Sequence, residues 1–164
     1  MKKIFLLIFF SAFLASCGSS HKATSTSKST SSKKVSNKKS DAIVKYAKTF
    51  EGTRYKFGGT TKKGMDCSGL VYTSYQKEGI EMPRISRDMA TKGKQISLSK
   101  ALEGDLVFFK TNKNKNTINH VGLVVENKHG EVFFIHSTSS LGVIISSLEE
   151  RYWKNFFVEV RRVI

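Results

Sequence analysis

Acidic residues are scarce in this sequence, with 13 Asp and Glu against 28 Lys and Arg and a formal net charge of +15. None of the acidic residues lies before Asp41, whereas eight lysines do, so residues 41–164 carry 20 basic and 13 acidic residues, a net charge of +7. A domain of this charge suits an anionic polymer or a membrane surface as well as nucleic acid. We expect no nucleic-acid partner, because the N-terminal segment indicates export.

The sequence also lacks a hydrophobic run of the roughly 20 residues that a membrane-spanning helix needs. Its leading apolar run, residues 4–10, follows two lysines and precedes small residues, which is the pattern of a secretory signal peptide. Residues 14–17, Leu-Ala-Ser-Cys, resemble the lipobox of bacterial lipoproteins. The resemblance implies a lipoprotein signal peptide over residues 1–16 and acyl chains on Cys17, and several chains give a lasting anchor. The alternative is an ordinary secretory leader with an incidental cysteine.

Apolar side chains are nearly absent from residues 17–40, where Ser, Thr and Lys dominate. Such a segment cannot offset the entropy cost of ordering. We therefore expect a disordered tether between the lipid on Cys17 and a single folded domain over residues 41–164. Gly18 stands where lipoproteins held at the inner membrane carry Asp, so the resemblance implies the periplasmic face of the outer membrane.

Helical patterns come first in the expected domain, and strand patterns follow. Asp41 can cap a helix that ends at Gly52, a second helix runs from Cys67 to Gly79, and a short helix covers residues 86–92. Helices followed by an antiparallel meander indicate an α+β fold. The runs that predict strands are residues 105–109, 120–125, 131–136, 143–145 and 157–161, with a hairpin turn at 127–130.

The expected domain contains a single cysteine, Cys67. Cysteines of exported proteins are usually paired, so an unpaired one indicates either a function or a buried, inert thiol. Asp66 and Ser68 are cap-type residues and Gly69 follows them, which places Cys67 at a helix start. There the helix dipole and free backbone N–H groups favour the thiolate and can stabilise an oxyanion. Cys67 is therefore a candidate nucleophile.

A thiol nucleophile needs a base, and the sequence offers four histidines. His21 lies in the expected tether and His129 in the expected turn. His120 begins one strand and His136 ends the next, so an antiparallel hairpin brings these two imidazoles to one edge of the sheet. We expect His120 to be the base for Cys67. The rival interpretation is a zinc site formed by the same three residues.

Several segments, in their order along the chain, resemble the NlpC/P60 family of cell-wall peptidases. The resemblance covers residues 41–164, and Met89 stands where many members carry Gln at one wall of the cleft. It implies a papain-like α+β fold in which the helix of the nucleophile packs on a mostly antiparallel sheet. The matching segments are residues 55–59, 66–71, 83–86, 104–109, 119–122 and 134–137.

The resemblance also implies roles for individual residues. Cys67 corresponds to the nucleophile, His120 to the general base and His136 to the residue that orients the base. The residues at positions that border the nucleophile or bind the substrate are Tyr55, Asp66, Ser68, Arg84 and Ser86. Arg84 is in addition a candidate partner for a stem-peptide carboxylate, with a plain surface charge as the alternative.

The implied function is that of a small lipoprotein endopeptidase that hydrolyses peptide bonds in peptidoglycan stems or cross-links, for wall growth or remodelling. We expect it to act as a monomer without a metal or other cofactor. Two alternatives stay open, a non-catalytic wall-binding lipoprotein and an N-acetylmuramoyl-L-alanine amidase. The aromatic segment 152–157 is expected to close the core.

Overall fold

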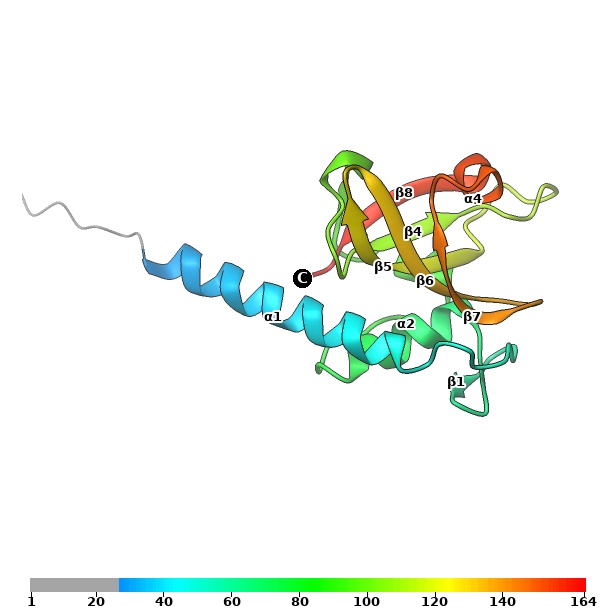
Figure 1. Ribbon diagram of the computed structural model, residues 1–164, viewed down its shortest axis with the longest axis horizontal. Helices are drawn as coiled ribbons and strands as arrows, with labels where there is room; N and C mark the ends of the chain where they lie inside the picture. The colour runs from blue at the N-terminus through cyan, green and yellow to red at the C-terminus, as the bar shows by residue number, and fades with distance from the viewer. Residues whose placement is uncertain (1–26) are drawn as a thin grey trace, which may run out of the picture.

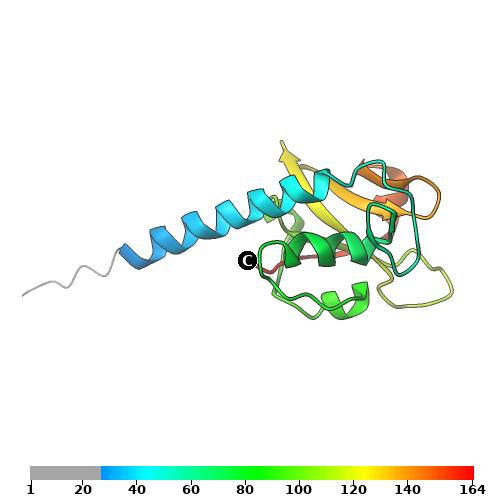
Figure 2. The same ribbon diagram turned by 90° about the horizontal axis from the view of Figure 1, so that it is seen from below.

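The computed structural model describes residues 27–164, with side chains from residue 37 onward. Two helices, α1 (Ser27–Lys48) and α2 (Cys67–Gln76), pack on one face of a six-stranded antiparallel sheet (Figures 1 and 2). This arrangement confirms the predicted α+β class. None of the helices within residues 27–164 combines the length and apolar character needed to cross a bilayer. The predicted signal peptide and the lipid site at Cys17 lie outside the described residues.

The sheet contains all five predicted strands and one that the sequence pattern missed. Its spatial order is β3-β8-β4-β5-β6-β7, so the last strand of the chain lies between β3 and β4. The missed strand, β3, is short and largely exposed, which removes the apolar alternation that marks a strand. The strands are β3 (Lys94–Ile96), β4 (Leu106–Phe109), β5 (His120–Lys128), β6 (Glu131–Thr138), β7 (Gly142–Ser147) and β8 (Phe157–Arg162).

Short elements surround this frame. Two-residue strands β1 (Thr60–Thr61) and β2 (Gly64–Met65) form a small hairpin before α2. Helix α3 (Ser86–Met89) is shorter than the predicted 86–92 helix, and a 3₁₀ turn covers Leu98–Lys100. Helix α4 (Arg151–Phe156) lies in the aromatic segment and precedes β8 directly.

Helix α1 begins earlier than its sequence predicts. It starts at Ser27, so residues 27–40 are helical rather than disordered, and the helix start predicted at Asp41 is wrong. Ile43 and Val44 are buried and anchor the last turns of the helix to the domain. Adding residues to an existing helix costs far less than nucleating one, and Lys is a good helix former. The rest of the predicted tether, residues 17–26, lies outside the described residues.

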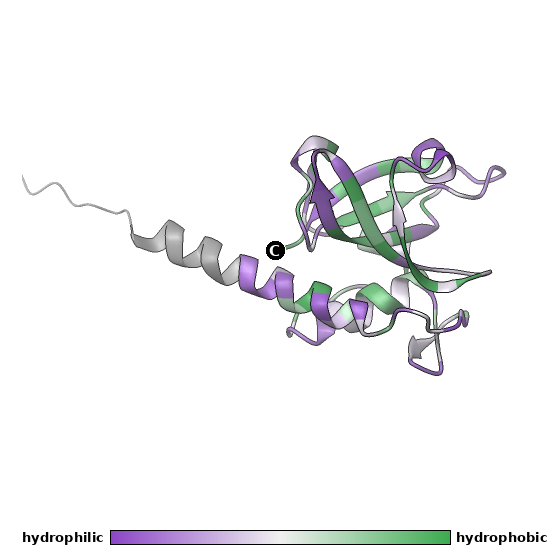
Figure 3. Cartoon of the chain, in the orientation of Figure 1, coloured by the Kyte–Doolittle hydropathy of each residue, from purple (hydrophilic) through white to green (hydrophobic). Residues whose placement is uncertain are grey.

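Both faces of the sheet are covered, which explains why its central strands are continuous apolar runs. Phe108 points to the side of α1 and α2, together with Ile43 and Leu70. Phe109, the next residue, points to the opposite side and packs with Trp153 of α4. Figure 3 shows the hydrophobic residues concentrated in α2 and the central strands.

A tight turn sets the register of the β5–β6 hairpin. His129 and Gly130 have φ angles of 53° and 93°, the positive values that a two-residue hairpin turn requires. The predicted turn is therefore confirmed. Leu123 pairs with Ile135, so the start of β5 lies beside the end of β6, where the two candidate histidines stand.

Candidate active site

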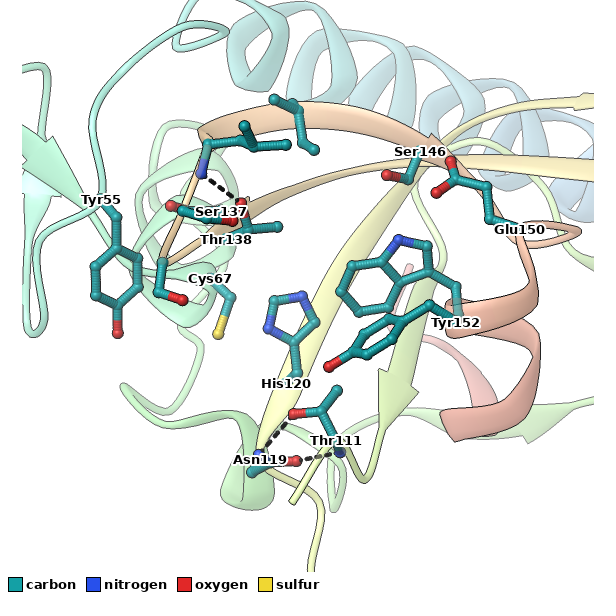
Figure 4. Close-up of a pocket in the computed structure, with 15 residues that line it drawn as sticks. Tyr55, Cys67, Thr111, Asn119, His120, Ser137, Thr138, Ser146, Glu150 and Tyr152 are labelled. Carbon is teal, nitrogen blue, oxygen red and sulfur yellow. Dashed lines mark hydrogen bonds between the residues drawn. The ribbon is translucent and has the colours of Figure 1, made fainter. Parts of the chain in front are cut away.

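A cavity of about 550 Å³ opens where α2, the start of β5 and the β6–β7 hairpin meet. Three of the predicted site residues, Tyr55, Cys67 and His120, line it (Figure 4). Its other lining residues are mainly hydroxyl and aromatic side chains, with Glu150 as the acidic one: Thr111, Asn119, Ser137, Thr138, Ser139, Ser140, Leu141, Ile144, Ser146, Glu150, Tyr152 and Trp153.

Cys67 is the first residue of α2, and Asp66 is its N-cap, as predicted. The Asp66 backbone is extended, and its Oδ1 accepts a hydrogen bond of 2.6 Å from the backbone N–H of Gly69. This is the bond by which an Asp cap satisfies the first turn of a helix. Gly69 also permits a close contact, because a Cβ there would lie 2.0 Å from the carbonyl oxygen of Gly59. The Asp-Cys-Ser-Gly sequence therefore fixes the start of α2, whose Cys67 lines the cavity.

The protonation of Cys67 differs from the expected thiolate. Burial raises the pKa of the thiol, and the nearby Asp66 carboxylate raises it further. Backbone N–H groups of Val121, Ser68 and Cys67 itself point at the sulfur and lower the pKa, but burial outweighs them. The direction of this pKa shift opposes the predicted thiolate and favours a protonated thiol before substrate is attacked.

His120 lies at the start of β5 and is buried. Its Nε2 lies 2.9 Å from Nδ1 of His136, which confirms that the hairpin brings the two imidazoles together. Nδ1 is then the nitrogen of His120 that remains for the thiol. Burial lowers the pKa of His120 to about 4. The imidazole is therefore neutral at pH 7 and able to accept a proton.

His136 is hydrogen-bonded to Ser146, a residue that sequence reasoning missed. Its Nε2 lies 3.1 Å from Oγ of Ser146 on β7, and both residues are buried. A base at Nδ1 of His120 requires the proton on Nε2, which His120 then donates to His136 Nδ1. His136 in turn carries its proton on Nε2 and donates to Ser146. One consistent set of tautomers thus runs along the three side chains.

Burial, and then the charge of His120, lower the pKa of His136 well below its ordinary value. The residue behind the base is therefore a neutral hydrogen-bond acceptor and not a charged group. It can hold the imidazole in place, but it adds no negative charge to balance an imidazolium. Ser146 could have been found only with the β6–β7 register in hand, since it lies diagonally opposite His136 and pairs with Phe134.

Trp153 of α4 contacts the candidate catalytic residues in addition to packing in the core, as predicted. Its ring stacks on that of His120, with centroids 5.1 Å apart and planes inclined by 19°. It meets His136 edge-on, with centroids 4.5 Å apart. Trp153 is 8% exposed and belongs to the core cluster behind the sheet, so the expected core role holds. Tyr152, in contrast, is 52% exposed and lines the cavity.

Four predicted substrate-binding residues are not among the side chains that line this cavity. Asp66 and Ser68 lie at the start of α2, and Arg84 and Ser86 lie before and at the start of α3. Arg84 places Nη1 2.9 Å from Oδ1 of Asp66 and Nη2 3.0 Å from its Oδ2. Arg84 also donates to Oγ of Ser68 at 2.9 Å and to the carbonyl of Gly59 at 3.2 Å. The guanidinium is thus engaged within the protein, and it is not the plain surface charge of the alternative. Ser86 begins α3 and is buried.

Tyr55 borders the nucleophile as the resemblance implies. It is 37% exposed, and burial raises the pKa of its hydroxyl, as do the Cys67 sulfur, once ionised at alkaline pH, and the Asp66 carboxylate. The hydroxyl is therefore protonated at neutral pH and can donate a hydrogen bond into the cavity. Figure 4 shows Tyr55 and Tyr152 on opposite sides of Cys67 and His120.

The zinc interpretation does not match the donor geometry. Among the side chains that the structure describes, those of residues 37–164, no three His, Cys, Asp or Glu residues converge as a ligand set. The nitrogens of His120 and His136 face each other at 2.9 Å, the length of a hydrogen bond. Two imidazoles on one zinc ion would each point a nitrogen at the metal from about 2.0–2.1 Å.

Comparisons with known proteins agree with the geometry. The model of the NlpC/P60 family matches residues 52–162. Murein DD-endopeptidase MepS/Murein LD-carboxypeptidase of Escherichia coli K12 is 42% identical over 127 residues, 77% of this chain and 63% of the relative, so the chain spans less than two thirds of that protein. NlpC of the same strain, named a probable endopeptidase, is 40% identical over 116 residues, 70% of this chain and 72% of the relative.

A solved structure extends the match to the fold. The structure of an NlpC/P60 family protein from Bacillus cereus superimposes with a TM-score of 0.69 at 29% identity. The match covers 76% of this chain and 40% of that one. The papain-like arrangement implied by the sequence is thereby confirmed.

Proposed function

Because this chain belongs to the NlpC/P60 family, we propose that it is a cysteine peptidase that hydrolyses peptide bonds in peptidoglycan stems or cross-links. The observation that carries the proposal is that Cys67 and His120 line one cavity, with His136 hydrogen-bonded behind His120 at 2.9 Å. Relatives at about 40% identity are named for endopeptidase activity, one of them on murein. The family's papain-like fold supports the same chemistry.

The reaction begins from a neutral thiol and a neutral imidazole. Nδ1 of His120 takes the proton of Cys67 as the sulfur attacks the carbonyl carbon of the scissile amide. The negative charge that develops on the carbonyl oxygen is stabilised by backbone N–H groups at the start of α2. His120 then gives its proton to the leaving amine, and the C–N bond breaks to leave a thioester on Cys67.

Water completes the cycle. His120 takes a proton from a water molecule, whose oxygen attacks the thioester carbon. The C–S bond then breaks, and His120 returns the proton to the departing sulfur, which releases a carboxylic acid and restores the neutral thiol and imidazole. The imidazolium that forms in each half-reaction lies under the face of Trp153, at 5.1 Å between ring centroids. An aromatic face attracts a cation at this distance. His136 and Ser146 keep the imidazole oriented throughout.

The decisive experiment is digestion of purified sacculi by the full chain, with the released fragments identified by mass. We expect fragments cut within stems or cross-links, and none from Cys67→Ala. His120→Gln should be equally inactive because it removes the base. Equal release by parent and Cys67→Ala would refute the mechanism. Stems freed intact from the sugar would identify an amidase, and binding to sacculi without fragments a wall-binding protein.

The placement of the protein in the cell envelope completes the proposal. We propose that residues 1–16 are removed, that Cys17 carries the acyl chains, and that the chain acts as a monomer on the periplasmic face of the outer membrane. The lipobox-like residues 14–17 and the Gly18 that follows them support this. Residues 17–40 then separate the enzyme from the membrane.

A further inference from the structure

A second hollow, of about 760 Å³, adjoins the catalytic cavity. It lies between α4 and the loop that joins β4 to β5, and it shares Thr111 and Tyr152 with the catalytic cavity. Its six lining residues are Thr111, Lys113, Arg151, Tyr152, Asn155 and Phe156. A ligand bound across the catalytic residues can therefore extend into this hollow without leaving the protein surface.

The walls of the hollow are held by hydrogen bonds at the base of the loop. The backbone N–H of Thr111 donates to Oδ1 of Asn119 at 2.8 Å, and Nδ2 of Asn119 donates to Oγ1 of Thr111 at 2.9 Å (Figure 4). The backbone N–H of Lys110 donates to the carbonyl of Phe156 at 3.0 Å, which ties the loop to the end of α4. The base of the loop is thus hydrogen-bonded to the end of α4 beside the active site.

The charge of the hollow is entirely positive. Lys113 and Arg151 are exposed, and in the described part of the chain neither makes an ion pair. Lys154, on the same helix, is in contrast paired with Glu149 at 2.6 Å. Lys113 and Arg151 share the lining of the hollow with the aromatic residues Tyr152 and Phe156. This combination suits a carboxylate on an otherwise uncharged peptide, which the rings can cover.

The catalytic cavity has the opposite charge. Glu150 lines it, and Oε1 of Glu150 accepts from the backbone N–H of Ser147 at 2.9 Å. A substrate carboxylate is repelled by Glu150 and attracted by Arg151, the next residue along the chain. Peptidoglycan stems carry carboxylates on residues next to their peptide bonds. The hollow, which shares Thr111 and Tyr152 with the catalytic cavity, is the adjoining place whose charge favours such a group.

We propose that Lys113, Arg151, Tyr152 and Phe156 form a subsite that binds a free carboxylate of the peptidoglycan stem next to the scissile bond. The inference rests on the proposed function, since it takes the ligand to be a wall stem peptide. The guanidinium of Arg151 can donate two hydrogen bonds to one carboxylate, and Lys113 adds a second positive charge. The subsite makes the protein favour stems whose carboxylates are free over stems in which they are amidated.

The test measures binding, so that hydrolysis is not needed. The full chain carrying Cys67→Ala is titrated calorimetrically with a synthetic stem peptide, either with free carboxylates or with the same groups amidated. Arg151→Gln should weaken binding of the free peptide about tenfold and Lys113→Gln severalfold, with little effect on the amidated one. Arg151→Lys keeps the charge and should recover part of the loss.

Lys154→Gln is the matched control, because it removes a cation from the same helix outside the hollow, and we expect it to leave the affinity unchanged. The inference is overturned if Arg151→Gln does not alter affinity for the free peptide, if it weakens both peptides equally, or if the free peptide does not bind. Cleavage of sacculi is measured separately with the intact chain. If the intact chain cleaves sacculi but Arg151→Gln leaves the peptide affinities unchanged, only the subsite proposal is refuted. If the protein binds the free peptide more tightly than the amidated one but does not cleave sacculi, only the peptidase proposal is refuted.

Discussion

Burial determines the protonation of both reacting side chains. The same dry environment raises the pKa of the Cys67 thiol and lowers that of the His120 imidazole to about 4, so the pair rests as two neutral groups. Charge separation then occurs only when a substrate is attacked. In the proposed mechanism, Trp153, stacked on His120, and the His136–Ser146 pair behind it stabilise and orient the charged imidazole.

This protonation predicts an acid limb at low pH. His120 must be neutral to take the thiol proton, so kcat/KM should stay level from neutral pH down to about 5 and fall as the pH passes below about 4. A pH–rate profile on a soluble stem-peptide substrate tests this. An acid limb near pH 6.5 would show that the imidazole is solvated and would contradict the burial argument.

Circular dichroism at each pH is the control for this profile. A buried histidine binds a proton more readily in the unfolded chain, so the pKa shift of His120 makes stability decrease as the pH falls from about 6.5 to 4. Loss of activity counts as titration of the base only where the protein is still folded.

Ser146 offers a second residue-scale prediction. Ser146→Ala leaves Nε2–H of His136 without its 3.1 Å partner in a buried site, which costs about 1–3 kcal/mol. The tautomer that supports the base becomes less populated, and we expect kcat to fall about tenfold. Ser147→Ala is the matched control, because the Ser147 hydroxyl donates a hydrogen bond of 2.6 Å to Oε1 of Glu131 and not to either of the two histidines. Equal kcat values for the two variants would show that Ser146 does not position His136.

At the scale of elements, the start of α2 presents Cys67, the proposed nucleophile. Asp66 caps the helix through Gly69 and accepts a 2.7 Å bond from the backbone N–H of Gly58, which joins the helix to the preceding loop. Arg84, which lies just before α3, forms an ion pair with the same Asp66 carboxylate. The cap could be predicted from four adjacent residues, whereas the Arg84 contact joins residues 18 positions apart and could not.

Arg84→Gln tests the importance of this junction. Asp66 is nearly buried, so removing its partner leaves a poorly solvated charge at the helix start. We expect the free energy of unfolding to drop by about 2 kcal/mol, measured by urea denaturation. Arg84→Lys should restore only part of it, because Lys cannot contact both carboxylate oxygens at once.

Arg87→Gln provides the comparison. Arg87 pairs with Asp88 at 3.5 Å, and its side chain is 65% exposed, so the change should stay within about 0.5 kcal/mol. Similar losses for the Arg84 and Arg87 variants would mean that the Asp66 contact contributes no more than a surface ion pair.

At the scale of the whole molecule, the proposed active site lies between two regions that are far apart in the sequence. Helix α2 brings the thiol, and the β5–β6–β7 portion of the sheet brings the imidazoles and Ser146. The long helix α1 extends away from the domain (Figure 1). Such a helix would hold the domain at a distance from whatever its N-terminal end is attached to.

The proposed lipid anchor on Cys17 can be tested by removing the cysteine. Cys17→Ala removes the proposed acylation site, so the protein should move from the membrane fraction to the soluble fraction and lose incorporation of radiolabelled palmitate. The soluble form should still digest sacculi in vitro, because the catalytic residues are untouched. Full retention of the variant in the membrane fraction, with label still incorporated, would exclude a lipid anchor at Cys17.

The sequence alone determined the α+β order, the five long strands, the placement of Cys67 at a helix start and the meeting of His120 with His136. These depend on hydrophobic periodicity, local caps and a short turn, all of which neighbouring residues specify. Tertiary structure decided the neutral thiol, the stacking of Trp153, the bond to Ser146 and the engagement of Arg84. These depend on burial and on contacts between distant segments, which no local pattern of residues encodes.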